Sequence, residues 1–514
     1  AGCVSEMNGR FVLSLWDKTK QQLTLMNDRH GFCPVYVWES SESYVFSSHY
    51  KAISTSDSFP RDVDVYGLAD FLSLGYCTGE RTFFRNVRLL PPASIVEVSL
   101  NGERSLRRYW DYTFSSEEDP VWTERDYVER FHATLHEALA RQADPAVTML
   151  LPISGGFDSR TLAGMLARTA CNGNVSALSY GHRHAFDVVY GRKIAKKCGY
   201  MHHFVPLESD YLSKYAEAFV WALEGTVNCL NAHMLSTIPY IYEVGADAVV
   251  TGFFGDIIAG SGTWIYSIGV HGSQDDQEIF DKQYKVHCDI MDNTSLKKYL
   301  KSEIYEKTKN ETRNVLWKKY LECPTKDRYF RSRYFSMHER QRRYTSFNLY
   351  VFDSVSDVIS PFIDYNFVDF SLHIPSSIAI YQRVYRKFIC EYFPELAKIP
   401  YNETKMPVNA SRVRKGLQWR WERLNKNRMV RSTVGRRWSK MNNKYIRAAD
   451  ALRGASREFV LDHILGNTFL EDYFNMYAVN KMVENHMENK SNEHMKILAL
   501  LTFAIWCNLF LRKK

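Results

Sequence analysis

The first part of the chain alternates hydrophobic and polar residues in short runs. Such alternation places every second side chain on the same face and is typical of β-strands with one buried face. The runs fall at residues 10–17, 22–28, 35–38 and 44–48, and a helical pattern follows at 65–74. Further strands are expected up to about residue 111. We therefore predict a β-rich module with few helices over residues 1–115, although the pattern alone fits any small β-sandwich.

From about residue 124 the pattern changes to hydrophobic runs that alternate with amphipathic helices. Strands are expected at 146–151, 174–180, 203–207 and 246–251, and helices at 125–142, 160–167 and 186–198. Strands that alternate with helices form a parallel, doubly wound sheet, which binds ligands at the carboxyl ends of its strands. Beyond residue 261 the chain is predicted to be mainly helical. The expected second domain, residues 116–514, is thus an α/β domain with a helical C-terminal part.

The most informative motif, Ile-Ser-Gly-Gly-Phe-Asp-Ser at 153–159, lies between an expected strand and an expected helix. Two glycines at such a turn let the backbone approach a ligand, and the first amides of the helix favour an anion. Serine hydroxyls can donate to phosphate oxygens, and Asp158 can hold a magnesium ion. The motif lacks the lysine and the spacing of the P-loop. It predicts a different pyrophosphate site, although a glycine-rich turn without function is an alternative for so short a match.

Composition narrows the class of protein. Hydrophobic residues make up 45% of the 514 residues and charged residues 24%, as in globular proteins. The ten cysteines include no Cys-x-x-Cys pair, which argues against a zinc ribbon and favours a cytoplasmic location. No signal peptide is expected, and the absence of an initial methionine suggests a fragment or a processed chain. The longest apolar stretch, 497–511, is short for a membrane span and predicts a buried helix.

The net charge of +8 is unevenly spread, because lysine and arginine crowd residues 412–447, where Glu422 is the only acid. Trp419, Trp421 and Trp438 are interleaved with the basic residues. One interpretation is a surface for nucleic acid or anionic lipid. The other is a solvated helical insertion that its tryptophans pack down. We favour the second, so no nucleic-acid partner is expected.

Taken together, the motifs resemble the glutamine-dependent asparagine synthetase family, whose synthetase half is an ATP pyrophosphatase domain. Residues 7–11, 28–36, 72–76 and 88–93 are similar to the second half of that family's glutaminase domain, a class II, Ntn-type domain. The family's glutaminase depends on an N-terminal cysteine and on residues that would precede Ala1. Cys3 does not match that cysteine. The resemblance therefore implies a truncated glutaminase-like module, without glutaminase activity in the chain as given.

The resemblance also implies site residues in the synthetase half. Tyr180 matches a contact to the adenosine, Asp187 the aspartate of a Ser-Pro-Asp turn, and Lys405 a lysine that stabilises charge on the adenylate and the leaving pyrophosphate. Asp158 and Asp256 match the aspartates that act with Mg²⁺, although both could merely cap helices. The remaining matched positions for ATP and pyrophosphate are Ile153, Ser154, Gly155, Gly156, Ser159, Thr251 and Gly252.

The chain departs from the family pattern where the acceptor and the amine would bind. The family's Ser-Gly-Glu-Gly-Ser-Asp-Glu is replaced at 251–257 by Thr-Gly-Phe-Phe-Gly-Asp-Ile. Phe253 and Ile257 thus stand in place of two glutamates, and Ile359 replaces an arginine in the segment before Pro361. A phenylalanine can neither bind ammonium nor remove a proton. The ATP-binding residues are therefore expected to be intact, and recognition of the acceptor is expected to differ.

The expected activity is that of an ATP-dependent amidoligase with ATP and Mg²⁺ as cofactors. A carboxylate, by default aspartate, would form an acyl-adenylate, and ammonia, free or derived from glutamine, would displace AMP. An apolar pocket around Phe253 and Phe254 suits the alternative of another carboxylate, including lactam-forming substrates. Two further alternatives are an RNA-modifying enzyme and a nucleotide-binding scaffold without turnover. A homodimer is considered as the assembly, and no membrane span is expected.

Overall fold

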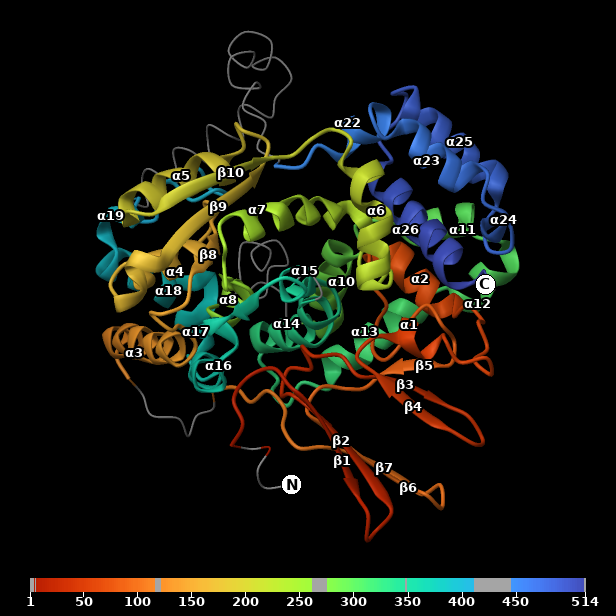
Figure 1. Ribbon diagram of the computed structural model, residues 1–514, viewed down its shortest axis with the longest axis horizontal. Helices are drawn as coiled ribbons and strands as arrows, with labels where there is room; N and C mark the ends of the chain where they lie inside the picture. Colours follow the sequence, from red (N-terminus) through yellow and green to blue (C-terminus); the bar gives the residue numbers. More distant parts are fainter. Residues whose placement is uncertain are drawn as a thin grey trace.

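The structure is a computed structural model that describes residues 4, 6–115, 122–260, 275–346, 349–410 and 445–512. The first part contains two antiparallel sheets (Figure 1). One has the order β1-β2-β6-β7 and the other β4-β3-β5. The strands are β1 (Val12–Asp17), β2 (Gln22–Asn27), β3 (Tyr36–Glu39), β4 (Tyr44–Ser47), β5 (Val87–Leu89), β6 (Ser94–Ser99) and β7 (Arg104–Arg108).

The two sheets are held together by a small apolar core. Leu25 and Val96 are directly opposed on β2 and β6, and both are buried with Val35 and Val37 from the region of β3. Two helices follow β4, namely α1 (Tyr50–Ile53) and α2 (Val65–Leu74). The Asp64 carboxylate caps the first turn of α2, and Gly75, with φ of 83°, ends the helix in the left-handed conformation. The predicted β-rich module with a helix at 65–74 is confirmed.

The second part is built on a parallel sheet of five strands in the order β10-β9-β8-β11-β12. Leu150 pairs with Ser176 on one side and Val249 on the other, so β8 is central. In Figure 1 helices α4 and α5 lie close to β8 and β9. The strands are β8 (Met149–Pro152), β9 (Val175–Gly181), β10 (Met201–Pro206), β11 (Ala248–Val250) and β12 (Asp357–Ile359).

Helix α3 precedes the first of these strands, and short and long helices connect one strand to the next. They are α3 (Glu124–Gln142), α4 (Asp158–Leu166), η2 (Ala170–Asn174), α5 (Phe186–Cys198), α6 (Tyr211–Leu223), η3 (Cys229–Thr237), α7 (Ile238–Glu243) and α8 (Gly255–Ile258). The capping box that Thr123 and Asp126 form at the start of α3, and the left-handed Gly199 after α5, agree with the expected helix ends. The doubly wound parallel sheet is confirmed, with strand ends displaced by one to a few residues from prediction.

The remainder is mainly helical, as predicted, apart from β12. Its middle part comprises α10 (Asp276–His287), α11 (Asn293–Tyr299), α12 (Ser302–Thr308), α13 (Glu311–Leu321), α14 (Arg328–Ser336), the π-helix η4 (Met337–Thr345), α15 (Leu349–Asp353), η6 (Pro361–Ile363) and α16 (Tyr365–Leu372). The last part comprises α17 (Ser376–Ala379), η7 (Ile380–Gln382), α18 (Arg383–Tyr392), α19 (Pro394–Ala397), α22 (Ala448–Arg453), α23 (Arg457–Leu465), α24 (Thr468–Glu471), α25 (Met476–Met487) and α26 (His494–Phe510).

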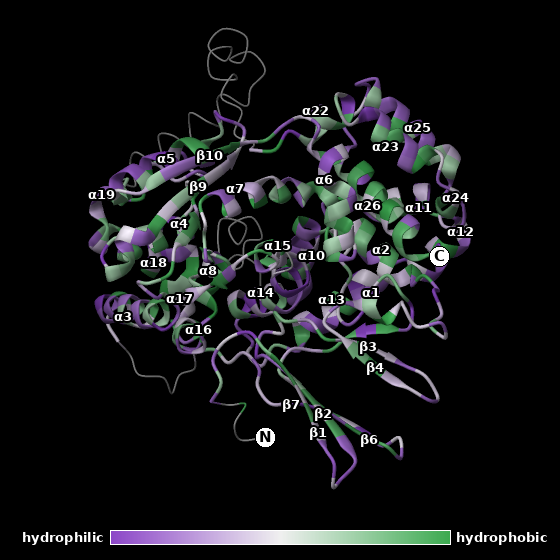
Figure 2. Ribbon diagram, viewed as in Figure 1, coloured by the Kyte–Doolittle hydropathy of each residue, from purple (hydrophilic) through white to green (hydrophobic). Residues whose placement is uncertain are grey.

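Helix α26 joins the two parts of the molecule. Most of it is buried, and Figure 2 shows it as a largely hydrophobic helix next to α6. Trp506 is 0% exposed, and its ring lies 5.0 Å from that of Phe83 and 4.9 Å from that of Phe84 in the β-rich module. Its indole N–H also donates to the hydroxyl of Tyr50, at 2.9 Å. The prediction of a buried helix here is confirmed, and no helix of the described residues is long and apolar enough to cross a membrane.

Candidate active site

The glycine-rich loop connects the central strand β8 to helix α4 and is held by its own hydroxyl groups. The Ser154 amide donates to the Ser159 hydroxyl and the Gly156 amide to the Ser154 hydroxyl, both at 3.1 Å. At Gly155 a Cβ atom would lie 2.9 Å from the Cβ of Asn402 and 3.0 Å from the Tyr190 ring. Only glycine therefore allows these segments to pack so closely. The loop lies at a carboxyl strand end, as predicted.

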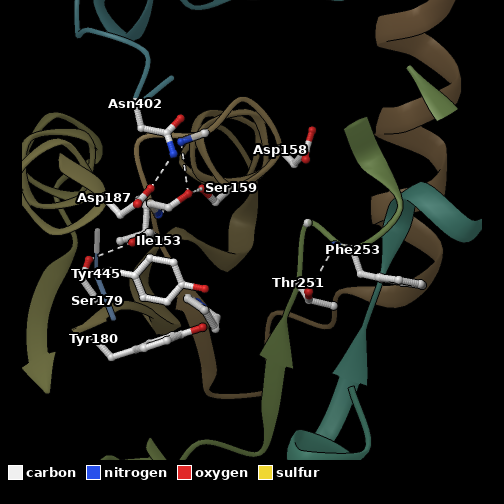
Figure 3. A pocket seen from close by; sticks show the side chains of 14 residues that line it. Ile153, Asp158, Ser159, Ser179, Tyr180, Asp187, Thr251, Phe253, Asn402 and Tyr445 are labelled. Atoms are coloured by element: carbon white, nitrogen blue, oxygen red, sulfur yellow. Dashed lines mark hydrogen bonds between the residues drawn. The ribbon is translucent and has the colours of Figure 1, made fainter. Parts of the chain in front are cut away.

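A pocket of about 380 Å³ opens beside this loop (Figure 3). It brings together residues from five separate parts of the sequence. Of the predicted site residues, Ile153, Ser154, Gly156, Asp158, Ser159, Tyr180, Asp187, Thr251 and Gly252 line it. Pro152, Ser179, Phe253, Asn402 and Tyr445 complete the lining. Gly155, Asp256 and Lys405 are predicted site residues that do not line it.

One side of the pocket is aromatic. Figure 3 shows Tyr180 at the end of β9 near Tyr445, and their ring centroids are 6.3 Å apart. The buried ring of His233 lies 5.6 Å from each of them. Three rings of this kind form a surface on which a flat heterocycle can stack. Tyr445 belongs to the basic segment of the sequence, most of which lies outside the described residues.

Two carboxylates meet where β8 and β11 end. Asp158 accepts the backbone N–H of Asp256 and, at 3.0 Å, the hydroxyl of Tyr385. Burial, and next the charge of Asp256, raises the pKa of Asp158 well above its usual value. Burial also raises the pKa of Asp256, although the charge of Arg340 opposes this shift. The pair is therefore an electrostatically strained site that favours a cation.

Two glycines bring the carboxylates together. A Cβ atom at Gly252 or at Gly255 would lie 2.6 Å from side-chain atoms of Asp158. Phe254, between them, has a φ of 73° at the start of α8, a left-handed conformation that is uncommon for a bulky side chain. The backbone passes so close to Asp158 that a side chain does not fit at position 252 or 255. This explains the glycine at 252. It also shows that Gly255 is needed, which the sequence alone did not indicate.

The carboxylate pair fits a hard divalent cation. Within the described residues there is no group of three or more His, Cys, Asp or Glu side chains that could hold a metal ion alone. Mg²⁺ commonly takes one or two carboxylates and fills its other positions with water and phosphate oxygens. Asp158 and Asp256 supply the oxygen donors for this arrangement, so the residues present agree with the expectation of Mg²⁺.

A turn near residue 402 closes over the loop. The Asn402 amide N–H donates to the carbonyl oxygen of Gly155 at 3.2 Å, and its side-chain amide donates to Asp187 at 2.6 Å. Burial raises the pKa of Asp187, while the Asn402 bond opposes the shift. Lys405 lies in the same turn with a φ of 58°, and its ammonium group is 5.7 Å from the Phe186 ring.

The opposite side of the pocket is formed by Phe253, which is 7% exposed. Its ring centroid lies 5.0 Å from that of Phe32 in the β-rich module, and Phe254 packs on the same ring at 5.3 Å. His30 packs in turn against Phe254, at 5.6 Å. Where the family pattern has a glutamate, this chain therefore has a continuous aromatic wall shared by its two parts.

Sequence reasoning missed several residues of the site. Tyr385, Asn402 and Tyr445 come from regions far from the glycine-rich loop along the chain, and none lies in a motif of its own. A signal did exist for Asn402, because it lies three residues before Lys405, which the resemblance to the family had singled out. No comparable signal distinguished Tyr385 or Tyr445 from the other tyrosines.

The fold and the site together define an α/β synthetase-like domain behind a β-rich module. Comparison with known families agrees: residues 1–110 match the glutamine amidotransferase domain, and residues 130–508 match the asparagine synthase family. The chain belongs to the asparagine synthase family.

Its curated relatives have several activities in their names. Asparagine synthetase [glutamine-hydrolyzing] 3 of Bacillus subtilis is 24% identical over 60% of this chain and 52% of its own length. Amidase chyE of Penicillium rubens is 23% identical over 48% of this chain and 39% of its own length. Carboxyethyl-arginine beta-lactam-synthase of Streptomyces clavuligerus is 25% identical over 49% of this chain and 47% of its own length. The chain thus spans about half of the length of these relatives, or less.

Proposed function

We propose that this protein is an ATP-dependent amidoligase that activates a carboxylate as an acyl-adenylate and transfers an amine to it. The observation that carries the proposal is the pairing of the pocket residue Asp158 with Asp256, beside a glycine-rich loop, in a chain from the asparagine synthase family. A loop of backbone amides and hydroxyls suits a pyrophosphate, and two carboxylates suit Mg²⁺.

Each residue has a proposed role in binding ATP. The hydroxyls of Ser154 and Ser159 donate to phosphate oxygens, and the Gly156 amide holds the Ser154 hydroxyl in place. The adenosine lies against Tyr180, between Ile153 and the Thr251–Gly252 backbone, and Tyr445 packs on the same side. Asp187 orients Asn402, which holds the turn over the loop. Asp158 and Asp256 hold Mg²⁺, which when bound neutralises charge on the phosphates.

The proposed reaction has two steps. A carboxylate oxygen of the acceptor attacks the α-phosphorus of ATP, and the bond to the β-phosphate bridging oxygen breaks to release pyrophosphate. The amine nitrogen then attacks the acyl carbon, AMP leaves, and the nitrogen loses a proton to solvent. Lys405 offsets negative charge on the leaving pyrophosphate. Its role is electrostatic stabilisation by a positioned charge, not covalent catalysis. The amine is ammonia, free or derived from glutamine.

Two classes of acceptor are proposed. Aspartate is the expectation from the asparagine synthetases among the relatives. The aromatic wall of Phe253 favours the second class, a carboxylate joined to an apolar group, because an apolar side chain gains more by burial against rings than the second carboxylate of aspartate does. The beta-lactam-synthase among the relatives agrees with an acceptor other than aspartate.

The test is Mg²⁺-dependent release of pyrophosphate from ATP with ammonium present. Aspartate is compared with a mixed pool of apolar carboxylates and with no acceptor. Asp158→Ala should abolish release, whereas Asp462→Ala, an exposed aspartate on α23, should not change it.

Release with aspartate and asparagine as the product would assign the first class. Release with the pool alone would assign the second. Binding of ATP without release under any acceptor would contradict the proposal and favour a scaffold without turnover.

A further inference from the structure

One arginine links the glycine-rich loop to the turn that carries Asn402 and Lys405. Arg160, in the first turns of α4, is 0% exposed. Its Nη1 donates to the carbonyl oxygens of Leu396 at 3.0 Å and Ile399 at 2.7 Å. Its Nη2 donates to those of Gly155 at 3.0 Å and Pro400 at 2.8 Å. A single planar guanidinium thus fixes two segments more than 230 residues apart in sequence.

The charge of Arg160 has no acidic partner among the residues described. Burying an unpaired charge is costly, and four carbonyl dipoles compensate for it only in part. Burial lowers the pKa of Arg160 to about 10, so the side chain stays charged at neutral pH. A hydrophobic residue would fill the same space but would leave the four carbonyl oxygens without this donor, so the guanidinium holds the two segments together rather than only filling space.

The Gly155 carbonyl is the point at which the two segments meet. It accepts from Arg160 and also from the Asn402 amide, at 3.2 Å. The same peptide unit continues into the N–H of Gly156, which lines the pocket. A charge-assisted hydrogen bond to the carbonyl of a peptide polarises its N–H and makes it a better donor. The Arg160 bond therefore strengthens the Gly156 N–H, which donates to the Ser154 hydroxyl at 3.1 Å and so positions the group that faces the phosphates in the proposed function.

We infer that Arg160 is a positioning residue for the nucleotide, which acts through the Gly155–Gly156 peptide and couples this peptide to the turn that holds Asn402 and Lys405. The inference rests on the proposed function, since it takes the ligand of the loop to be a nucleotide. Arg160 is thereby added to the residues that support nucleotide binding, although it does not line the pocket. The alternative is an anchor that contributes to folding alone.

Arg343 provides a matched control. It is also buried, at 4% exposed, and its guanidinium donates to the carbonyl oxygens of Cys77, at 2.8 Å, and Arg81. It lies in the π-helix η4 and holds loops of the β-rich module, and it is not a pocket residue. Substitution of either arginine by lysine keeps a charge but loses the planar set of donors. Both variants should therefore lose stability, and only one should lose affinity for the nucleotide.

The experiment measures binding of Mg²⁺ with α,β-methylene-ATP, which cannot be split between its α and β phosphates, by calorimetry. Arg160→Lys, which keeps the charge but loses the planar set of donors, should raise the Kd by about tenfold, and Arg160→Gln, which also loses the charge, should raise it by more. Arg343→Lys should leave the Kd within about twofold, although its melting temperature should fall as far as that of Arg160→Lys. Equal Kd values for the two lysine variants would overturn the inference.

A second measurement needs no substitution and covers the case of a variant that does not fold. In the unmodified chain, the nucleotide should slow hydrogen exchange of the amides in residues 396–405 as well as in 153–159. Protection of 153–159 without any change at 396–405 would overturn the coupling. Absence of binding by the unmodified chain, with no protection anywhere, would instead contradict the proposed function.

Discussion

Asp158 and Asp256 make the stability of the site depend on pH. Burial raises the pKa values of both carboxyls in the folded state, and the charge of Asp256 adds to the shift of Asp158, above the value of about 3.9 for an unfolded aspartate. The folded state therefore binds their protons more tightly than the unfolded state does. Stability from this source is complete below the unfolded pKa and is lost as the pH rises through the folded pKa values. At neutral pH the pair weakens the fold unless a cation occupies it.

We predict that Asp158→Asn stabilises the protein without nucleotide at neutral pH. The amide oxygen can still accept the Tyr385 hydroxyl, while the repulsion with Asp256 disappears. The melting temperature should rise by about 2 °C at pH 7.5 and should not rise near pH 4. Thermal unfolding followed across this pH range tests the prediction, with Asp462→Asn as the control. A fall in melting temperature at pH 7.5 would show that the pair is not strained.

We predict that a glutamate cannot simply be restored at position 253. Phe253→Glu would place a carboxylate against the Phe32 ring, in a wall without a paired cation, and should lower the free energy of unfolding by about 3 kcal/mol. Phe253→Leu, which stays apolar, should cost about 1 kcal/mol. Urea unfolding distinguishes the two. Equal costs would mean that this side of the pocket is open to water.

At the scale of residues, the sequence predicted those site residues that are neighbours along the chain. The glycine-rich loop lies in one heptapeptide, and the structure places most of its residues along the pocket. Asn402 and Tyr445 reach the same pocket, and Tyr385 reaches the Asp158 carboxylate, through long-range folding that no local pattern encodes. Nothing in the sequence distinguishes these two tyrosines from the rest of the 32. The roles assigned to individual residues by resemblance stay predictions.

Elements with a long periodic pattern were predicted well, and short ones were not. Helix α5 has thirteen residues and ends at a glycine, and its bounds agree with the expected helix. Strand β12 has three residues, Asp357–Ile359, which is too short to show a period. It is a strand because its pairing with β11 and the Thr251 N–H that donates to Ile359 hold it at the sheet edge.

Helix α26 offers a test of how the two parts are joined. Trp506→Phe keeps most of the apolar contact with Phe83 and Phe84 but removes the N–H that donates to Tyr50, and should cost about 1 kcal/mol. Trp506→Ala also leaves a cavity and should cost about 3–5 kcal/mol. Chemical denaturation of the two variants measures both. A similar cost for each would mean that the hydrogen bond, rather than packing, dominates at this position.

For the whole molecule, the order and class of the two parts were predictable, but their packing was not. Glu224, at the end of α6, accepts the amide N–H groups of Tyr50 and Lys51 from the β-rich module. Tyr50 also shares one apolar core with α26. No sequence pattern indicates which hydrophobic residues of one part face the other. The boundary near residue 115 remains a prediction.

We predict that the two parts stay together after the chain is cut between them. A protease site introduced at residues 116–121 and then cleaved should give fragments that elute as one species, because the shared core and the Glu224 contacts remain. Size-exclusion chromatography before and after cleavage tests this. The same cut in a Trp506→Ala, Glu224→Ala chain should release the fragments, and free fragments from the unsubstituted chain would contradict the shared core.

The burial of Trp506 among Tyr50, Phe83 and Phe84 also sets the order of events during biosynthesis. A ribosome makes the β-rich module long before the segment around residue 506 emerges. Until then the surface of that module that α26 covers stays open to water, and exposed apolar surface of this kind recruits chaperones or leads to aggregation. Translation that stalls shortly before α26 should therefore yield an insoluble nascent chain, although almost all of the pocket has by then been synthesised.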